Sequence, residues 1–189
     1  EYIISEFMNA AGIPTTRALL ALKTNESVIR DTELPGGILA RVANSHIRIG
    51  TFEFAAMQGT GILEKLADYS IVRHYPELKD INERYLKFFA AVCENQTKLV
   101  SKWMNIGFIH GVMNTDNVTI SGETIDYGPC AFMDYYDPKT VFSSIDDAGR
   151  YCYGNQPAIL IWNLSKLAEA LIPLIDNKEQ KSIEKLTEV

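Results

Sequence analysis

Two oxygen-bearing side chains in the segment HGVMNTDNVTISGETIDYG (110–128) could hold a divalent cation. Asn117 ends a polar loop, and Asp126 follows nine positions later, beyond two short apolar runs, VTI and TI. If these runs are short strands around a turn at Ser121, both side chains return to the same end of a hairpin. Mg²⁺ prefers hard oxygen ligands and commonly takes further ligands from phosphates. The spacing therefore predicts magnesium-dependent chemistry on ATP.

The order of residues in this segment resembles the catalytic core of protein kinases. His110 and Asn117 keep the separation found in the kinase loop H-R-D-x-x-x-x-N, and the DYG run at 126–128 can stand for D-F-G. The position of the kinase base holds Val112, whose apolar side chain cannot accept a proton. Asp116 is the nearest available carboxylate. The segment therefore indicates either a non-catalytic relative or an enzyme in which another group acts as the base.

Each of these features is common when it stands alone. A single histidine at the edge of a strand is more often a hydrogen-bonded structural residue than a catalytic one. Asp116 and Asn117 could be ordinary turn residues, because Asn and Asp favour such loops. Their order, after a long helix and before a hairpin, favours a kinase-like site over these structural explanations.

The elements before the site are expected to be one helix and one hairpin. Apolar residues at helical spacing predict a helix over residues 1–11, with Gly12 as its stop. The runs TRALLALKT and SVIRDT, with Asn25-Glu26 between them, predict a β-hairpin. Pro35-Gly36-Gly37 is expected to form a turn, after which ILARV continues as an extended segment.

The rest of the chain is expected to be mainly helical. Helices are predicted at 51–58 and at 60–70, the second with Thr60 as its cap. The strongest periodic signal lies at 81–105, and another apolar helix begins near Pro157. The buried stripe of the first is expected to contain Tyr85, Phe88, Phe89, Val92, Leu99, Val100, Trp103 and Met104. That of the second is expected to contain Ile159, Trp162, Leu167 and Leu171, and the polar tail 176–189 to be a frayed helix.

Composition limits the classes of partner. The 189 residues carry a formal net charge of -6, which argues against nucleic acid as a partner. The three cysteines show no metal-ligand spacing and are expected to be free thiols. We find no run of roughly 18 apolar residues and expect no membrane span. Because the first residues already read as the middle of a helix, we expect the chain to be part of a longer protein.

Longer motifs make the resemblance specific. The runs HGVMNTDN, TIDYGP and GRYxYxNQPAIxxWNLxxLA closely resemble the selenoprotein O family, and so do GIPTTRAL and ARVANSHIRIGTFEF. The similarity covers nearly the whole chain, although between residues 57 and 100 only the helix pattern is shared. These motifs are long and unusual, so chance is a poor explanation.

The resemblance implies an α+β, protein-kinase-like fold. Residues 1–50 would be the end of the N-lobe, with a helix and a β-hairpin, and residues 51–189 a mostly helical part of the C-lobe with the catalytic loop and the DYG turn. The family resembles a pseudokinase because its usual catalytic Asp is missing. Its members transfer AMP from ATP to Ser, Thr or Tyr hydroxyls of proteins.

The same resemblance implies roles for individual residues. Asn117 and Asp126 would be ligands of Mg²⁺ or Mn²⁺, with Asp126 also close to the nucleotide. Asp116 would accept the proton of the incoming hydroxyl. Arg41 and Arg48 would contact the ATP phosphates, a task that suits the planar, permanently charged guanidinium group. The carboxylate of Glu1 would pair with an ATP-binding Lys that precedes this segment in the family.

The resemblance also implies partners, a compartment and a limit. ATP and hydroxyl-bearing proteins would be the partners, with no nucleic acid and no membrane. Bacterial members are cytoplasmic and eukaryotic members mitochondrial. The family's Gly-rich loop and ATP-binding Lys lie before Glu1, so we expect the isolated chain to bind ATP weakly and to transfer little or no AMP. Two alternatives stay open: a non-catalytic pseudokinase scaffold and an ATP-dependent phosphotransferase.

Overall fold

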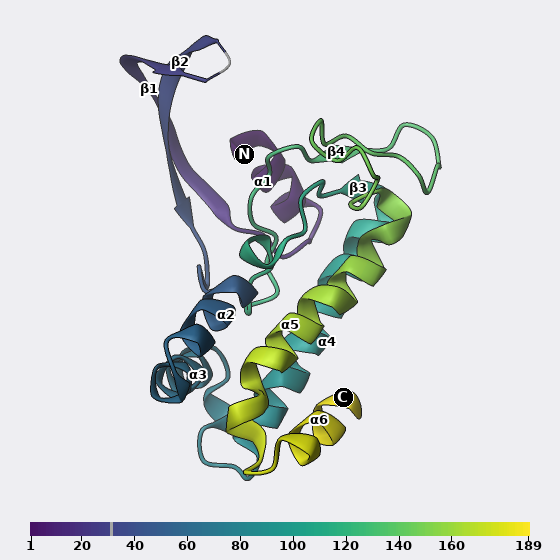
Figure 1. Ribbon diagram of the computed structural model, residues 1–189. Helices are drawn as coiled ribbons and strands as arrows, with labels where there is room; N and C mark the ends of the chain where they lie inside the picture. The colour runs from purple at the N-terminus through teal and green to yellow at the C-terminus, as the bar shows by residue number, and fades with distance from the viewer. Residues whose placement is uncertain (31) are drawn as a thin grey trace.

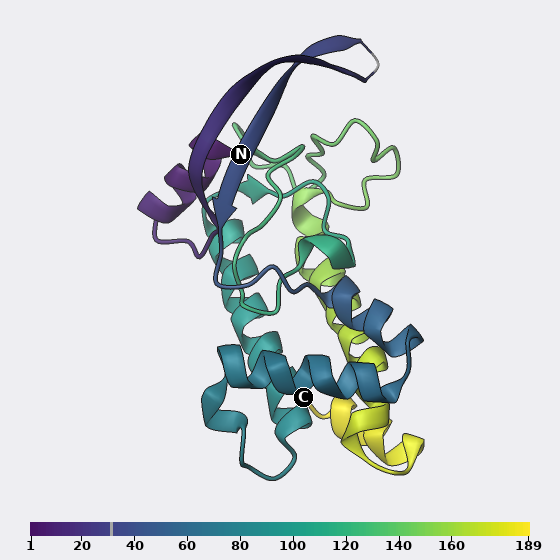
Figure 2. The same ribbon diagram turned by 90° about the vertical axis from the view of Figure 1, so that its left-hand side faces the viewer.

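The computed structural model describes residues 1–30 and 32–189 and shows helices together with two small antiparallel sheets. A long hairpin extends away from the helical body, and two long helices, α4 and α5, lie side by side through that body (Figures 1 and 2). The helices are α1 (Tyr2–Ala10), α2 (Ile49–Met57), α3 (Thr60–His74), α4 (Arg84–Asn105), α5 (Gln156–Ile175) and α6 (Glu179–Thr187). The strands are β1 (Arg17–Ile29), β2 (Glu33–Val42), β3 (Phe108–Ile109) and β4 (Ala131–Phe132), and the 3₁₀ turns are η1 (Pro76–Leu78), η2 (Thr115–Asn117) and η3 (Tyr153–Asn155). The α+β class predicted from the sequence is therefore confirmed.

The β1–β2 hairpin turns later than the sequence predicted. Asn25-Glu26 is no turn, because β1 continues through it to Ile29. Pro35-Gly36-Gly37 is no turn either, because it lies within β2, with Gly37 paired to Lys23. The register shifts between Lys23 and Ser27, and there the strands approach closely: a Cβ on Gly36 would lie 2.8 Å from the carbonyl oxygen of Glu26. The glycine thus accommodates an irregularity within the ladder. The predicted strand 27–32 includes Asp31, which lies outside the described residues.

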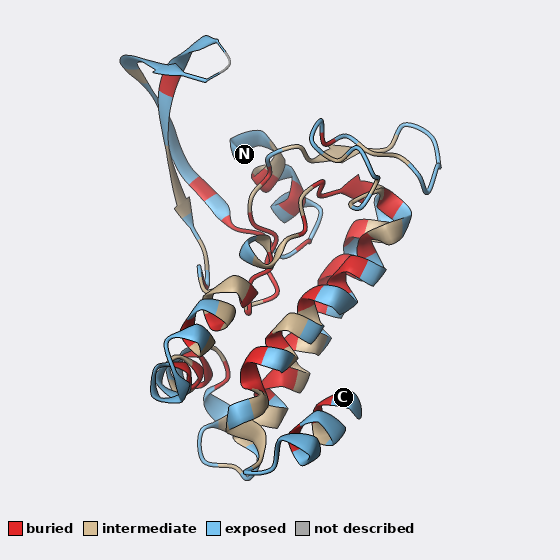
Figure 3. Ribbon diagram, viewed as in Figure 1, coloured by how far each residue is buried: buried red, intermediate tan, exposed pale blue. Residues whose placement is uncertain are grey.

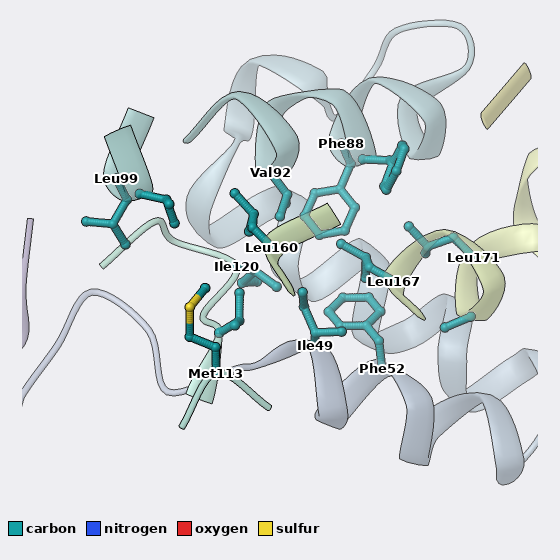
Figure 4. Close-up of a cluster of buried hydrophobic side chains, with 14 of the residues drawn as sticks. Ile49, Phe52, Phe88, Val92, Leu99, Met113, Ile120, Leu160, Leu167 and Leu171 are labelled. Carbon is teal, nitrogen blue, oxygen red and sulfur yellow. The ribbon is translucent and has the colours of Figure 1, made fainter. Parts of the chain in front are cut away.

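The core lies where α2 and α3 meet α4 and α5. Figure 3 shows the buried residues concentrated along the facing sides of these helices, and Figure 4 draws 14 side chains of the core, ten of them labelled. The periodic stripe of α4 is largely confirmed, with Tyr85 and Met104 half-buried at its ends and the remaining members buried. Each fully buried apolar side chain of this size stabilises the fold by about 1.5–3 kcal/mol.

Two details of the helices differ from the sequence prediction. Trp162 does not face the core but is 38% exposed, and the guanidinium of Arg150 lies 4.7 Å above its ring. A cation and a broad ring attract each other at the surface, so the tryptophan can stay outside. Thr60 is the first residue of α3 and not its cap, since Gly59 takes the cap position without a side-chain hydrogen bond.

Helix α5 is the apolar helix that the sequence predicted to begin near Pro157. The stretch Tyr153–Ile175 has a mean hydropathy of 1.6 over an 18-residue window and is long enough to cross a membrane by length and composition. Polar residues interrupt the stretch, so it is no continuous run of apolar residues, and its hydropathy alone does not test the expectation of no membrane span. Core helices of soluble proteins pass the same test, and α5 packs against α2, α3, α4 and α6.

The three cysteines are free thiols, as predicted. Burial raises the pKa of the Cys93 thiol to about 12. Such a thiol stays protonated and is a poor nucleophile at neutral pH.

Candidate active site

The segment between β3 and β4 reverses direction without forming the two short strands that the sequence predicted. Val118 and Thr124 form a single antiparallel bridge, and Thr119 forms another with Arg48. The reversal is pressed against α4, because a Cβ on Gly122 would lie 2.8 Å from the Cβ of Asn95. Because Gly122 lies so close to α4, the chain reverses there with one bridge between Val118 and Thr124 and without a longer pair of strands.

His110 is a structural residue at the start of this segment. Its ring is fully buried, its Nε2 donates to the carbonyl oxygen of Ile125 at 2.8 Å, and its Nδ1 accepts the N–H of Val112 at 3.3 Å. These partners require the neutral tautomer with the proton on Nε2. Burial lowers the pKa of His110 and keeps the ring neutral. The histidine therefore fixes the residue before Asp126 and does not transfer protons.

Asn117 and Ile125, the residue before Asp126, both contact the stretch 110–112. The amide Nδ2 of Asn117 donates to the carbonyl oxygen of Val112 at 2.9 Å, while His110 holds Ile125. The Asn117 side chain and the backbone of Ile125, the residue before Asp126, therefore contact two residues that are only two positions apart in the chain. Asn117 and Asp126 also flank the bridge between Val118 and Thr124.

The donor atoms of this pair suit a hard cation. Asn117 uses its nitrogen for the protein contact, which leaves its amide oxygen available. Within the described residues, no group donates a hydrogen bond to the carboxylate of Asp126, whose backbone adopts the left-handed φ of 66°. No cluster of three or more His, Cys, Asp or Glu that could hold a metal exists in that part of the chain. An amide oxygen and one carboxylate match Mg²⁺, which completes its shell with water and phosphate oxygens.

Glu1 and Arg41 lie beside the DYG turn. The Glu1 carboxylate accepts the backbone N–H of Tyr127 at 3.1 Å and lies 3.4 Å from the Arg41 guanidinium. The resemblance implied a lysine partner for Glu1; within this chain its cationic neighbour is Arg41. Glu1 thus holds an arginine next to the residue that follows Asp126.

Arg48 and Asp116 lie at the start of α2. The backbone N–H of Arg48 donates to the hydroxyl of Thr51 at 3.1 Å, and its Nε is buried without a protein partner among the described residues. Asp116, on η2, is exposed and reaches the first turn of α2, where a Cβ on Gly50 would collide with its Oδ1. The contacts therefore join Glu1 to Arg41 and to Tyr127, the residue after Asp126, and bring Asp116 to the first turn of α2, which Arg48 precedes.

Comparison with known proteins decides the family. A family model described as "Protein adenylyltransferase SelO" matches residues 1–188. The chain belongs to the SelO family. It is 61% identical to the protein nucleotidyltransferase YdiU of Cereibacter sphaeroides over 191 residues, which covers 100% of this chain and 40% of that protein. It is 59% identical to the YdiU proteins of Geobacillus kaustophilus (97% of this chain, 38% of that protein) and Rhizobium leguminosarum (100% and 38%).

The SelO membership confirms the resemblance expected from the motifs. The chain spans about 40% of the length of the curated relatives that it matches. The structure of this SelO chain explains why a glycine follows His110. Gly111 has a φ of 85°, and a Cβ there would lie 2.9 Å from Pro129. The start of the segment 110–128 therefore packs directly against the residue after the DYG turn.

Two polar contacts of the segment 110–128 could not be predicted from the sequence. The carboxylate of Glu123 is buried and accepts from the backbone N–H and side-chain amide of Asn44, at 2.9 and 2.7 Å. The hydroxyl of Thr15 meets that of Tyr127, and burial raises the pKa of Tyr127 to about 12. Both contacts join residues far apart in the sequence, so no spacing pattern could have indicated them.

The main hollows of the described surface lie away from the site. One, of about 410 Å³, is lined by Asn44, Arg73, His74, Tyr75, Asn95 and Ser121, and a second of the same volume lies at the tip of the β1–β2 hairpin. Among the best-formed hollows of the described residues, none is lined by Asp116, Asn117 or Asp126.

Proposed function

We propose that the protein to which this chain belongs transfers AMP from ATP to Ser, Thr or Tyr hydroxyls of other proteins. The family description and the names of the relatives support this activity. The observations that carry the proposal are that Asn117 and Ile125, the residue before Asp126, contact the same short stretch 110–112, and that the Asp126 carboxylate accepts no hydrogen bond among the described residues. The amide oxygen of Asn117 and the carboxylate of Asp126 suit a magnesium or manganese ion bound to ATP.

The residues divide the work between charge and position. Asn117 and Asp126 hold the divalent ion, which, when bound, offsets the charge of the triphosphate. Arg41 and Arg48 bind phosphate oxygens, for which their guanidinium groups are well shaped. Asp116 orients the acceptor hydroxyl and takes its proton as the hydroxyl oxygen attacks the α-phosphorus and pyrophosphate leaves. Positioning contributes most of the acceleration, since an ordinary Asp is a weak base at neutral pH.

The fold that accompanies this function is kinase-like. Residues 1–50 would be the end of an N-lobe and residues 51–189 part of a helical C-lobe. The exposed hairpin supports this division, because apolar side chains such as Leu19, Ile29 and Ile38 are 68%, 84% and 57% exposed. Apolar strands that stand free in a sheet of two are typical of a larger sheet whose other strands lie elsewhere.

The isolated chain is expected to bind ATP weakly and to transfer little AMP. Its coverage of about 40% of the relatives supports this expectation. Calorimetric titration of the chain with an ATP analogue and Mg²⁺, beside the full-length protein, measures the difference. Equal affinity and equal transfer rates would contradict the expectation.

The full-length protein allows the reaction to be identified by labelling. ATP that carries its label on the α-phosphate should leave that label on an acceptor protein, and Asp126→Ala and Asn117→Ala should each abolish the transfer. Asp80→Ala, which changes an exposed carboxylate distant in sequence from the site segment, is the control and should retain it. Transfer of a γ-phosphate label alone would refute AMP transfer and support a phosphotransferase.

A non-catalytic scaffold is the second candidate. The observation that favours it is Val112, because an apolar residue stands where kinases place their base. A scaffold would transfer neither label but would still bind its partner, and Asp126→Ala would leave that binding intact.

A further inference from the structure

We propose that the hydroxyl of Tyr127 is a positioning group for Asp126, acting through a hydrogen bond to Thr15. The inference rests on the proposed function, because it assigns a role to a neighbour of the expected metal ligand. It concerns the one residue by which the DYG turn differs from D-F-G. A phenylalanine at this position would lack the hydroxyl and with it this contact.

The tyrosine is held at both of its ends. Its ring is buried with 3% exposure and packs edge-on against Phe108, with 6.1 Å between ring centroids. At one end its backbone N–H donates to Glu1 at 3.1 Å, and at the other its hydroxyl meets the hydroxyl of Thr15, which is itself 6% exposed. Both partners belong to the first sixteen residues, so this part of the chain fixes the residue directly after Asp126.

The direction of the hydrogen bond follows from counting protons. Thr15 has one hydroxyl proton, which it donates to the carbonyl oxygen of Thr16 at 3.0 Å. The Thr15 oxygen can therefore only accept from Tyr127, and the phenol is the donor. Removal of the tyrosine hydroxyl leaves the threonine with its own donation intact, so a phenylalanine variant creates no unsatisfied donor.

The same part of the chain also holds the other side of the turn. The backbone N–H of Thr16 donates to Thr124 at 3.1 Å, and that of Thr124 donates to Pro14 at 3.0 Å. The Thr124 hydroxyl donates to Pro14 as well and accepts from the indole of Trp103. Residues 14–16 therefore contact the turn on both sides of Asp126, at Thr124 and at Tyr127.

Asp126 needs such support because of its backbone. It is one of two non-glycine residues with a positive φ among the described residues, at 66°. L-residues with a side chain disfavour this region, so the surrounding contacts must maintain it. If the contact to Thr15 is lost, the turn gains freedom and the carboxylate meets the cation from a wider range of positions.

Mn²⁺ binding by the full-length protein with a non-hydrolysable ATP analogue tests the inference, measured by electron paramagnetic resonance. Tyr127→Phe should weaken Mn²⁺ binding by about 3- to 10-fold, the range expected for one hydrogen bond. It should also speed hydrogen exchange at the backbone amide of residue 127. Thr15→Val should have a similar effect. Because both variants remove the same hydrogen bond, the double variant should bind Mn²⁺ no more weakly than the single variant with the lower affinity.

The matched control removes a hydroxyl elsewhere. Tyr153 is also buried, and its hydroxyl donates to the carbonyl oxygen of Met104 at 2.6 Å, outside the site. Tyr153→Phe should lower the melting temperature but leave Mn²⁺ affinity unchanged. If Tyr127→Phe keeps wild-type Mn²⁺ affinity and wild-type hydrogen exchange while Asp126→Ala abolishes binding, the inference about Tyr127 is overturned and the proposed function is not. Unchanged binding in Asp126→Ala would overturn the metal site of the proposed function and this inference with it.

Discussion

Replacement of Gly50 by alanine should separate the activity of the full-length protein from its stability. Gly50 is the second residue of α2, and a Cβ there would collide with Oδ1 of Asp116 and lie 3.2 Å from its Cγ. Carbon atoms pack comfortably at about 3.5–4.0 Å, so the carboxyl group must retreat by roughly 0.5–1 Å. A displacement of about 1 Å at a reacting group can lower a rate about 100-fold. We therefore expect Gly50→Ala to lower kcat for AMP transfer by about 10- to 100-fold.

Stability should respond in the opposite direction. Alanine in a helix is more favourable than glycine by about 0.5–1 kcal/mol, and Asp116 is exposed and can move without opening the core. The melting temperature of Gly50→Ala should therefore stay equal or rise. An enzyme that loses activity while it gains stability cannot have lost it by unfolding.

Helix α3 offers a matched control for this variant. Gly61 is likewise the second residue of its helix, and a Cβ there would meet nothing within 4 Å. Gly61→Ala should leave kcat unchanged. The assay is the initial rate of α-label transfer at saturating ATP, beside a thermal melt of each variant. Wild-type kcat in Gly50→Ala would refute the placement of Asp116 as the group that receives the proton.

Two further predictions concern the polar groups that support the site. Because burial lowers the pKa of His110 below its ordinary value of 6.5, the unfolded chain binds the extra proton first as the pH falls. The contribution of neutral His110 to the free energy of unfolding should therefore have its full value above pH 6.5. Below pH 6.5 the free energy of unfolding should decline, by at most about 1.4 kcal/mol per pH unit for this proton. Urea titrations at several pH values should show a shallower decline of the free energy of unfolding in His110→Gln. Part of the decline should remain because burial also lowers the pKa of His74. An unchanged decline in the variant would contradict the role given to His110. Glu123→Gln should cost about 1–3 kcal/mol in the same titration, because one of its oxygens that accepts from Asn44 becomes a donor, whereas the exposed Glu94→Gln should change little.

The helices could be predicted from the sequence because their signal is local. The stripe of α4 depends on apolar residues three and four positions apart, and its six central members are buried. Trp162 failed the same rule because a tryptophan can satisfy its ring with a cation at the surface, here Arg150. Periodicity identifies which residues can face a core but not which large ring is left outside it.

The hairpin was misread because glycine and proline have two meanings. Pro35-Gly36-Gly37 has the composition of a turn, yet the structure places it in β2 opposite the irregular part of β1. Glycine also allows two backbones to approach, as it does at Gly36. Composition alone cannot separate a chain reversal from a close approach, because the difference depends on the register of the partner strand.

The candidate site shows what sequence spacing can predict and what it cannot. The interval between Asn117 and Asp126 indicated a shared end of a hairpin, and the stretch 110–112 contacts Asn117 and Ile125, the residue before Asp126. The contacts that hold Tyr127, the residue after Asp126, however, come from Glu1 and Thr15, which lie more than one hundred positions away in the sequence. A motif can carry the ligands in its own sequence, but the left-handed backbone at Asp126 needs contacts that no local pattern encodes. Variants at Thr15 and Gly50 are therefore more informative about this site than further changes within the motif, because they alter the position of a carboxylate and keep its chemistry.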